Sequence, residues 1–329
     1  DTLAEIAERS RRYLAGRRAL LEQRIATGHV RDGHGDLLAD DIFCLDDGPR
    51  ILDCLAFRDD LRISDVLLDI AFLVMDLDRI AGPAVARDVM HWYQEFSNEH
   101  HPASLAHFYV AYRALVRAKV SCLAAEGGAA GAERDARLLL GLCAEHLRRS
   151  TVRLVLVGGA PGSGKSTVAD GLCDRYGWNL LASDELRKDL TGVGHDEHAF
   201  AAADQGIYDP RTTELTYRTL VDEARRLLEL GHSVVLDASW TTEDQRALAR
   251  RAAADTSSDL VAFECVLDPD IAAERVSRRL ATMYSPSDAT PDIALTLSGR
   301  RDAWPEAMPL DTAQPPDDVV DAATEAIGR

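Results

Sequence analysis

The stretch VRLVLVGGAPGSGKS, residues 152–166, decides the fold of the second half of this chain. Its beginning, VRLVLVGG, is a mostly apolar run of the kind found in buried parallel strands. The loop GAPGSGKS (159–166) matches the pattern G-x-x-x-x-G-K-[ST] at every position. Because a strand precedes the loop and a helical pattern follows it, the context is the one that a phosphate-binding loop requires. The sequence therefore predicts a site for a nucleoside triphosphate.

Each residue type in this loop has a physical role in phosphate binding. Glycines let the backbone curl so that its N–H groups converge on phosphate oxygens, and the following helix N-terminus adds partial positive charge. Lys165 should reach the β- and γ-phosphates, and the hydroxyl of Ser166 should ligate Mg²⁺. The residues expected to bind the nucleotide are Gly159, Ala160, Pro161, Gly162, Ser163, Gly164, Lys165, Ser166 and Thr167.

Two later segments place carboxylates after predicted strands. SVVLDAS (233–239) puts Asp237 at a strand end, where it can hold Mg²⁺ directly or through water; a strand-capping Asp is the alternative. ASDELRKDL (182–190) follows another strand, and in P-loop kinases of small molecules this location faces the acceptor hydroxyl. Asp184 is a candidate to orient or deprotonate that hydroxyl, and Arg187 to hold an anionic group of the acceptor. A helix cap is the alternative for Asp184.

A helix farther along carries three arginines. AAERVSRRL (272–280) contains Arg275, Arg278 and Arg279, at the position where a lid closes over the nucleotide in such folds. An arginine there can stabilise charge on the transferring phosphoryl group, and Arg275 and Arg279 are the catalytic candidates. An ordinary solvated basic face is the alternative. The segment MYSPSDATPD (283–292) has the Pro and Asp content expected of a mobile loop beside that lid.

The two halves of the chain have different patterns. Before residue 150, apolar residues recur at helical spacing, with a short strand-like region near residues 34–57. After Thr151, strands and helices alternate, which predicts a parallel sheet covered by helices. The fold class is therefore α/β overall, with a mainly helical (α+β) first domain. The predicted domains are 1–150 and 151–329. One helix is expected from Leu3 to about Ile25, and a loop over AQPPDD (313–318).

Composition narrows the class of partner and compartment. The 329-residue chain is 46% hydrophobic and has a formal net charge of −18, which argues against nucleic acid as a partner. Its six cysteines form no CxxC pair and are expected to be free thiols in a reducing compartment. No apolar run approaches the length of a membrane span, and the N-terminal residues lack a signal-peptide pattern. We therefore expect a cytoplasmic protein that acts on a small molecule.

A second catalytic pattern stands near the start of the sequence. HGDLLADDIF (34–43) has the spacing of a kinase catalytic loop, H-x-D followed five residues later by Asn. Asp36 occupies the place of the catalytic base, and Asp41 the place of the Asn. ILDCLAF (51–57) offers Asp53 as a further metal-binding carboxylate. Only 33 residues of the sequence precede this loop, fewer than a nucleotide-holding kinase lobe needs.

These segments resemble known families. Residues 30–120 look like the C-terminal lobe of the aminoglycoside phosphotransferase family, in which HGDLHxxNI, hDCIEF and DhAFLhMDL recur; here they stand as HGDLLADDI, LDCLAF and DIAFLVMDL. The second half resembles the gluconate kinase, zeta-toxin and polynucleotide-kinase group of P-loop kinases. The order of the halves resembles bacterial fusion proteins that join such a phosphotransferase-like domain to an ATP-binding domain. The resemblance implies ATP and Mg²⁺ as cofactors.

The first half departs from its family at positions that matter for catalysis. Leu38 replaces a His, Asp41 an Asn, and Ala56 a Glu, and the Gly-rich loop and strand Lys of an N-terminal lobe are absent from the sequence. Asp41 could still ligate Mg²⁺, but a third carboxylate beside Asp36 and Asp53 raises the electrostatic cost of an empty site. We therefore expect this half to serve as a scaffold or regulator, with these three carboxylates as subordinate candidates.

Three functions are compatible with these patterns. The first is a kinase that transfers the γ-phosphoryl group of Mg-ATP to a hydroxyl of a small molecule, with nucleotide-sugars or nucleic-acid ends as variant acceptors. The second is a nucleotide-controlled regulatory or binding module with weak ATPase activity. The third is an antibiotic-modifying phosphotransferase, which rests on the first half alone. Neither the acceptor nor the oligomeric state follows from the sequence.

Overall fold

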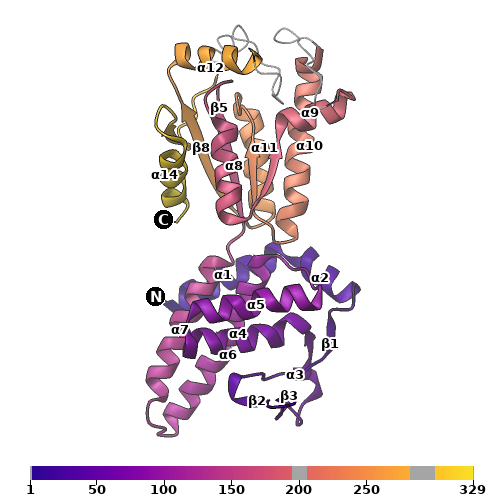
Figure 1. Cartoon of the computed structure of the whole chain (residues 1–329), viewed down its shortest axis with the longest axis vertical. Coiled ribbons are helices and arrows are strands. Elements are labelled where there is room, and N and C mark those ends of the chain that lie inside the picture. The colour runs from indigo at the N-terminus through magenta and orange to yellow at the C-terminus, as the bar shows by residue number, and fades with distance from the viewer. Residues whose placement is uncertain (1, 195–205, 282–300, 329) are drawn as a thin grey trace. The chain divides into compact units, whose positions relative to one another are not determined.

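The computed structural model of this chain describes residues 2–194, 206–281 and 301–328, apart from the side chains of residues 279–281 (Figure 1). The chain divides into two compact units. The N-terminal unit comprises Asp1–Thr151 with Glu229–Gly231, and the C-terminal unit comprises Val152–Leu228 and His232–Arg329.

The N-terminal unit is mainly helical with two short two-stranded sheets. Strands β1 and β4 pair antiparallel, as do β2 and β3. Its elements, in order, are α1 (Thr2–Gly16), α2 (Arg18–Ala26), β1 (Val30–Asp32), η1 (Ala39–Asp41), β2 (Ile42–Leu45), β3 (Gly48–Ile51), α3 (Asp59–Arg62), β4 (Ile63–Asp65), α4 (Val66–Ala81), α5 (Pro83–Ser97), α6 (Ala103–Glu126) and α7 (Ala132–Arg149).

The single helix expected from Leu3 to Ile25 is two helices. Helix α1 ends at Gly16, and Arg17 has φ −115° and ψ 21°, outside the helical region. Glycine weakens a helix because it loses the most backbone entropy on folding. Arg17 is 1% exposed, and its guanidinium lies 5.9 Å from the centre of the Tyr13 ring. The break between the two helices therefore places Arg17 in a buried position beside Tyr13.

An ionic network is buried in the N-terminal unit. Arg24 of α2 donates from Nη2 to Asp65 Oδ1 at 2.7 Å and from Nη1 to Glu99 Oε1 at 2.6 Å. All three side chains are at most 7% exposed. Burial opposes ionisation of Glu99, but hydrogen bonds from His101 and Arg24 outweigh it and lower its pKa to about 2. Paired in this way, charges tolerate burial and tie α2, the start of α4 and the end of α5 together.

The C-terminal unit is an alternating arrangement of strands and helices. Its elements, in order, are β5 (Arg153–Gly159), α8 (Lys165–Tyr176), β6 (Asn179–Ala182), α9 (Ser183–Thr191), η2 (Gly206–Tyr208), α10 (Pro210–Glu229), β7 (Val234–Asp237), α11 (Glu243–Asp255), β8 (Asp259–Val266), α12 (Pro269–Ala281), β9 (Met308–Asp311) and α14 (Pro316–Gly328).

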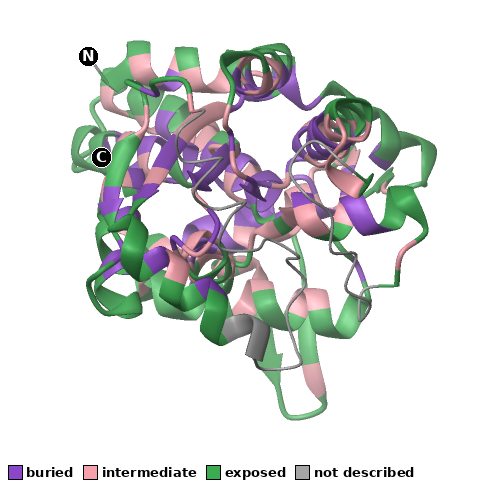
Figure 2. Ribbon diagram, turned by 90° about the horizontal axis from the view of Figure 1, so that it is seen from above, coloured by how far each residue is buried: buried purple, intermediate pink, exposed green. Residues whose placement is uncertain are grey.

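These strands form one parallel sheet with the order β6-β7-β5-β8-β9. The central strand β5 is buried along nearly its whole length, which explains the apolar run in its sequence. Side chains from β5, β8, α8 and α14 form one apolar core, including Val155, Phe263, Leu172 and Ala323. Figure 2 shows buried residues on the inward sides of the helices and exposed residues on their outer sides. The parallel sheet predicted for the second half is confirmed.

Strand β9 has no counterpart in the sequence prediction. Its four residues include Pro309, and proline within a run argues against a strand because it cannot donate to the ladder. The strand lies at the sheet edge beside β8, where such a residue is tolerated. The loop expected over 313–318 is shorter than predicted, because α14 begins at Pro316, a favoured first helical residue.

No helix in the described part of the chain is both long enough and apolar enough to cross a membrane.

Candidate nucleotide-binding site

The phosphate-binding loop lies between β5 and α8, at the carboxyl edge of the sheet. Val157 of β5 is in register with Asp237 of β7, and Gly159 with Cys265 of β8. Because parallel strands end at the same edge, the end of β7 lies beside the start of the loop. Ligands of open parallel sheets bind outside this edge. The topology therefore brings Asp237 next to a loop that is 71 residues away from it in sequence at Ser166.

The loop requires glycine at Gly162 for two reasons. Its φ is +81°, a left-handed conformation that costs other residues energy. A Cβ at this position would also lie 2.5 Å from the backbone oxygen of Ala272 and 2.8 Å from Cγ2 of Val276, both on α12. Helix α12 therefore packs against the loop backbone so closely that no side chain fits.

We expect Gly162→Ala to destabilise the C-terminal unit by about 2–4 kcal/mol and to weaken nucleotide binding, because the left-handed cost of about 1–2 kcal/mol adds to the clash with α12. The matched control is Gly177→Ala, where φ is +66° and a Cβ meets nothing within 4 Å. Urea unfolding would measure both variants. Equal losses of stability would show that α12 does not confine the loop.

Three polar side chains converge at the start of α8. Ser166 donates from Oγ to Asp237 Oδ2 at 2.6 Å, and Lys165 Nζ lies 3.5 Å from the backbone oxygen of Ala160. Burial raises the pKa of Asp237, and the nearby negative charge of Asp184 raises it further, while Lys165 and Ser166 act in the opposite direction. The positive charge near Asp237 therefore does not offset the cost of burying its ionised carboxylate.

The oxygens of Ser166 and Asp237 fit a Mg²⁺ ion. Asp237 Oδ1 is buried and has no hydrogen-bond partner among the described residues. A buried carboxylate oxygen with unused lone pairs is unfavourable unless a cation or water meets it. No group of three or more His, Cys, Asp or Glu side chains in the described ranges is arranged to hold a metal. Mg²⁺ suits such a site because it takes oxygen ligands and keeps waters and phosphate oxygens in its shell.

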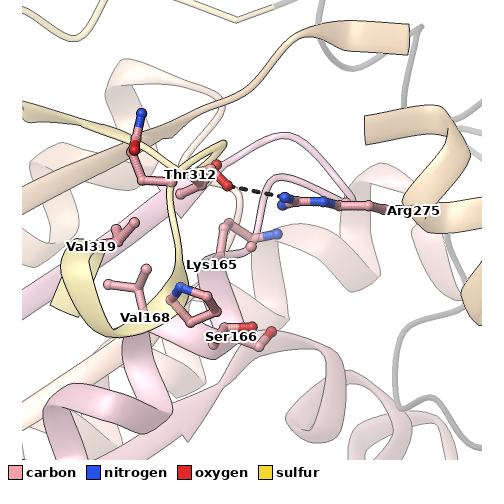
Figure 3. A pocket seen from close by; sticks show the side chains of 11 residues that line it. Lys165, Ser166, Val168, Arg275, Thr312 and Val319 are labelled. Carbon is pink, nitrogen blue, oxygen red and sulfur yellow. Dashed lines mark hydrogen bonds between the residues drawn. The ribbon is translucent and has the colours of Figure 1, made fainter. Parts of the chain in front are cut away.

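A cavity of about 330 Å³ continues from the loop (Figure 3). On its far side, Arg275 of α12 donates from Nη2 to the backbone oxygen of Thr312 at 3.1 Å. Val168 and Val319 supply an apolar wall. The lining residues are Gly162, Gly164, Lys165, Ser166, Thr167, Val168, Arg275, Thr312, Gln314, Pro316 and Val319. A mixed apolar and polar cavity beside the phosphate loop suits the nucleoside part of a nucleotide.

Five of these residues were missed by sequence reasoning: Val168, Thr312, Gln314, Pro316 and Val319. Val168 lies in α8, and the other four lie in the turn after β9 and the start of α14. The only signal for them was the Gln-Pro-Pro loop at 314–316, which predicts a turn but no ligand.

The structure puts Asp184 and Arg187 on the same helix in different environments. Asp184 lies in the first turn of α9, half-buried, and close enough to Asp237 to raise the pKa of that carboxyl. Arg187 is 6% exposed, and its Nη1 donates at 3.1 Å to Ile207 O and to Thr213 Oγ1. Its guanidinium also lies 4.9 Å from the centre of the Tyr208 ring. Arg187 therefore connects α9 to η2 and to the start of α10.

The arginines of α12 do not share one environment. Arg275 is exposed but contacts the cavity, whereas Arg278 forms an exposed pair with Glu274 at 2.7 Å. The side chain of Arg279 and the segment 283–292 lie outside the described residues.

The loop at 34–41 is held firmly within the N-terminal unit. Asp69 of α4 accepts hydrogen bonds from the backbone N–H of His34 at 2.6 Å and of Gly35 at 2.9 Å. Burial raises the pKa of Asp36, which lies 3.9 Å from Arg117. Asp41 accepts from the backbone N–H of Leu38. Hydrogen bonds to the side chains of Asp69 and Asp41 thus hold the backbone of this loop in place.

The three candidate carboxylates of this region differ in exposure. Asp36 is half-buried, Asp41 is partly buried, and Asp53 is exposed with φ +63°. They are not part of any group of three or more potential metal ligands found among the described residues. Their roles as base and metal ligands stay predictions.

Comparisons with known proteins relate the C-terminal unit to a family of P-loop proteins. Residues 154–300 match the family model described as an AAA domain. Uncharacterized proteins of Mycobacterium tuberculosis (strain ATCC 25618 / H37Rv) and Mycobacterium bovis (strain ATCC BAA-935 / AF2122/97) are 41% identical to the chain over 315 residues. The match covers 96% of this chain and 63% of theirs, so the chain spans less than two thirds of the length of these relatives.

Solved structures also match over about half of the chain. A gluconokinase from Sinorhizobium meliloti 1021 is 19% identical, with a TM-score of 0.40, over 54% of this chain and 92% of that one. The APS kinase of Mycobacterium tuberculosis is 21% identical, with a TM-score of 0.41, over 54% of this chain and 98% of that one. The resemblance of residues 30–120 to the aminoglycoside phosphotransferase family stays a prediction. The loop geometry and the family match together make the C-terminal unit a P-loop domain similar to the AAA domain family.

Proposed function

We propose that the C-terminal unit is a kinase that transfers the γ-phosphoryl group of Mg-ATP to a hydroxyl group of a small molecule. The observation that carries this proposal is the position of Asp184 near the Ser166–Asp237 pair. Nucleotide binding needs the loop, Lys165 and the metal-facing oxygens. In this proposal, Asp184 is the additional carboxylate, which accepts the proton of the acceptor hydroxyl.

The transfer balances with groups of this chain. The acceptor oxygen forms a bond to the γ-phosphorus as the bond to the bridging oxygen of ADP breaks, and the hydroxyl proton passes to the carboxylate of Asp184. Lys165 and the loop N–H groups hold the phosphates in line and stabilise their charge. Mg²⁺, held by Ser166 and Asp237, would neutralise charge on the β- and γ-phosphates. Arg275 closes the nucleoside side of the cavity through its bond to Thr312.

A second cavity supports a small-molecule acceptor. It has a volume of about 520 Å³ and lies between η2, α10 and α11. Tyr217, which lines it, is close enough to Asp184 for that carboxylate to act on the pKa of its phenol. Arg187 shapes the same wall through its contacts with Tyr208 and Thr213. The net charge of −18 argues against a nucleic-acid acceptor.

The experiment compares wild type, Asp184→Asn and Glu185→Gln for transfer of labelled γ-phosphate to pooled hydroxyl compounds. The helix-cap alternative for Asp184 is wrong, because the N-cap of α9 is Ala182 and Asp184 lies within the first turn. Asparagine keeps the size of the side chain but cannot accept the proton. We expect Asp184→Asn to lose transfer by about 10²–10⁴-fold, with nucleotide affinity within about threefold of wild type. Glu185 is the exposed neighbour on the same helix and its variant should behave as wild type.

Retention of transfer by Asp184→Asn would remove the acceptor role from this carboxylate. If wild type binds ATP but phosphorylates no compound, the nucleotide-controlled regulatory module becomes the better description. In that case the N-terminal unit is the part whose binding partner should be sought.

A further inference from the structure

Arg301 lies near the carboxyl edge of the sheet, and none of the sequence motifs predicted a role for it. Its Nη2 lies 3.0 Å from Glu264 Oε1, on β8, and 3.5 Å from the backbone oxygen of Ser239, two residues after Asp237. It also acts, together with Lys165 and Asp237, on the pKa of the Cys265 thiol, which burial raises to about 12. Through Ser239, which follows Asp237 by two residues, Arg301 lies at the end of β7 that carries this carboxylate.

The backbone that carries Arg301 is anchored on the turn between β7 and α11. Asp302 donates its N–H to Thr241 O at 3.0 Å and accepts from the N–H of Glu243 at 2.9 Å. Arg246, which is 1% exposed, donates to Asp302 O at 3.2 Å and to Ala303 O at 2.9 Å. These hydrogen bonds on the two residues that follow Arg301 fix the position of its backbone.

An aromatic side chain extends this anchor. Trp304 is 7% exposed and its ring lies against the backbone of Gly158, where no Cβ could fit. The guanidinium of Arg246 lies 5.4 Å from the centre of the same ring. A flexible surface arginine has no comparable support. Part of the conformational entropy of the Arg301 side chain is thus lost on folding, before any ligand binds.

The guanidinium of Arg301 has donors left over. Both of its contacts involve Nη2, and Nε is buried with no hydrogen-bond partner among the described residues. Guanidinium offers five N–H donors in a planar fork that matches phosphate oxygens. An unsatisfied buried donor in a preorganised arginine points to an anionic ligand.

The strand order indicates which part of the nucleotide Arg301 meets. The nucleoside cavity is lined by Thr312, directly after the edge strand β9, and the loop leaves the central strand β5. Arg301 contacts Ser239 after β7 on one side of β5 and Glu264 of β8 on the other side, so its guanidinium spans the end of the strand from which the loop leaves. A nucleotide with its base beside β9 and its phosphates on the loop extends its terminal phosphate toward β7.

We propose that Arg301 contacts the γ-phosphate of the bound nucleotide, with Glu264 as its partner when no nucleotide is present. Glu264 is 31% exposed and Arg301 15% exposed at the side chain, so the pair is partly hydrated and exchanges partners at low cost. The γ-phosphate is a doubly charged acceptor whose oxygens match the planar fork of the guanidinium. This role rests on nucleotide binding by the loop and not on the proposed transfer step.

The test measures, by isothermal titration calorimetry with Mg²⁺, the affinity for ADP and for an ATP analogue with an NH group between the β- and γ-phosphates. The ratio of the two affinities reports contacts to the γ-phosphate alone. We expect Arg301→Met to lower this ratio by about 10–100-fold, which is the value of a hydrogen bond to a charged group, with ADP affinity within about twofold of wild type. Arg301→Lys should keep part of the preference.

Glu264→Gln is the matched control because it breaks the same ion pair and keeps the arginine. Its ratio should equal or exceed that of wild type. An unchanged ratio in Arg301→Met would overturn the proposal, as would an equal fall in Glu264→Gln or a wild-type protein that binds neither nucleotide. If the ratio falls in Arg301→Met while wild type phosphorylates no acceptor, Arg301 keeps its role and the proposed function fails. If wild type transfers phosphate while Arg301→Met keeps the ratio, only the role of Arg301 fails.

Discussion

Lys165→Ala is expected to reduce turnover of ATP by about 10²–10³-fold, the typical result of removing one donor from a preorganised anion site. The ammonium group of Lys165 lies 3.5 Å from the carbonyl oxygen of Ala160, and Lys165 lines the cavity beside the loop. It is therefore ready to exchange this weak contact for phosphate oxygens. Alanine keeps the helix, because it has the highest helix propensity. Release of labelled γ-phosphate in the presence of Mg²⁺ measures the effect.

The informative companion to this variant is Asp36→Ala in the N-terminal unit. Asp36 belongs to the loop that resembles a kinase catalytic loop, and under our proposal its removal leaves turnover within about twofold of wild type. Loss of turnover in Asp36→Ala with full activity in Lys165→Ala would contradict the assignment and move the reaction to the N-terminal unit. Both variants should retain the far-ultraviolet circular dichroism of wild type, since neither side chain belongs to an apolar core.

Asp237→Asn should reduce turnover by a similar factor while making the nucleotide-free protein more stable at neutral pH. The amide would not balance the charge of a Mg²⁺ ion held at this site, so we expect the proposed transfer to be lost. Burial raises the pKa of Asp237, so the folded C-terminal unit favours the neutral carboxyl group. Asparagine is always neutral and still accepts from Ser166, which removes the cost of an ionised buried group.

The sign of the pH dependence follows from this raised pKa. In wild type, the stabilisation from a neutral Asp237 is fully present below the ordinary carboxyl pKa of about 4 and is lost as pH rises through the higher folded-state pKa. The gain from Asp237→Asn should therefore be absent near pH 4 and grow toward pH 7. Thermal melts without nucleotide would detect it, at about 2–4 °C per kcal/mol for a unit of this size. A variant that is less stable than wild type at pH 7 would contradict the role of burial.

Local patterns predicted the central features of the C-terminal unit. The apolar run of β5, the glycine-rich loop and the helix after it were expected from residues 152–176, and Asp237 was expected at a strand end. The sequence missed β9, because a proline within four residues hides an edge strand. It also missed the break at Arg17, because the apolar spacing continues across Gly16 while a buried cation interrupts the helix.

The sequence by itself determined the presence and chemistry of the phosphate loop, because its glycines, lysine and serine act within eight consecutive residues on backbone geometry that is local. Only the tertiary structure decided which distant residues complete the site. Thr312 and Val319 line the cavity beside the phosphate loop because β9 joins the sheet edge, and Arg301 reaches the β7 end because Trp304 and Arg246 anchor its backbone. Such meetings depend on strand order and packing across more than 60 residues of chain, and no periodicity in a single sequence encodes them.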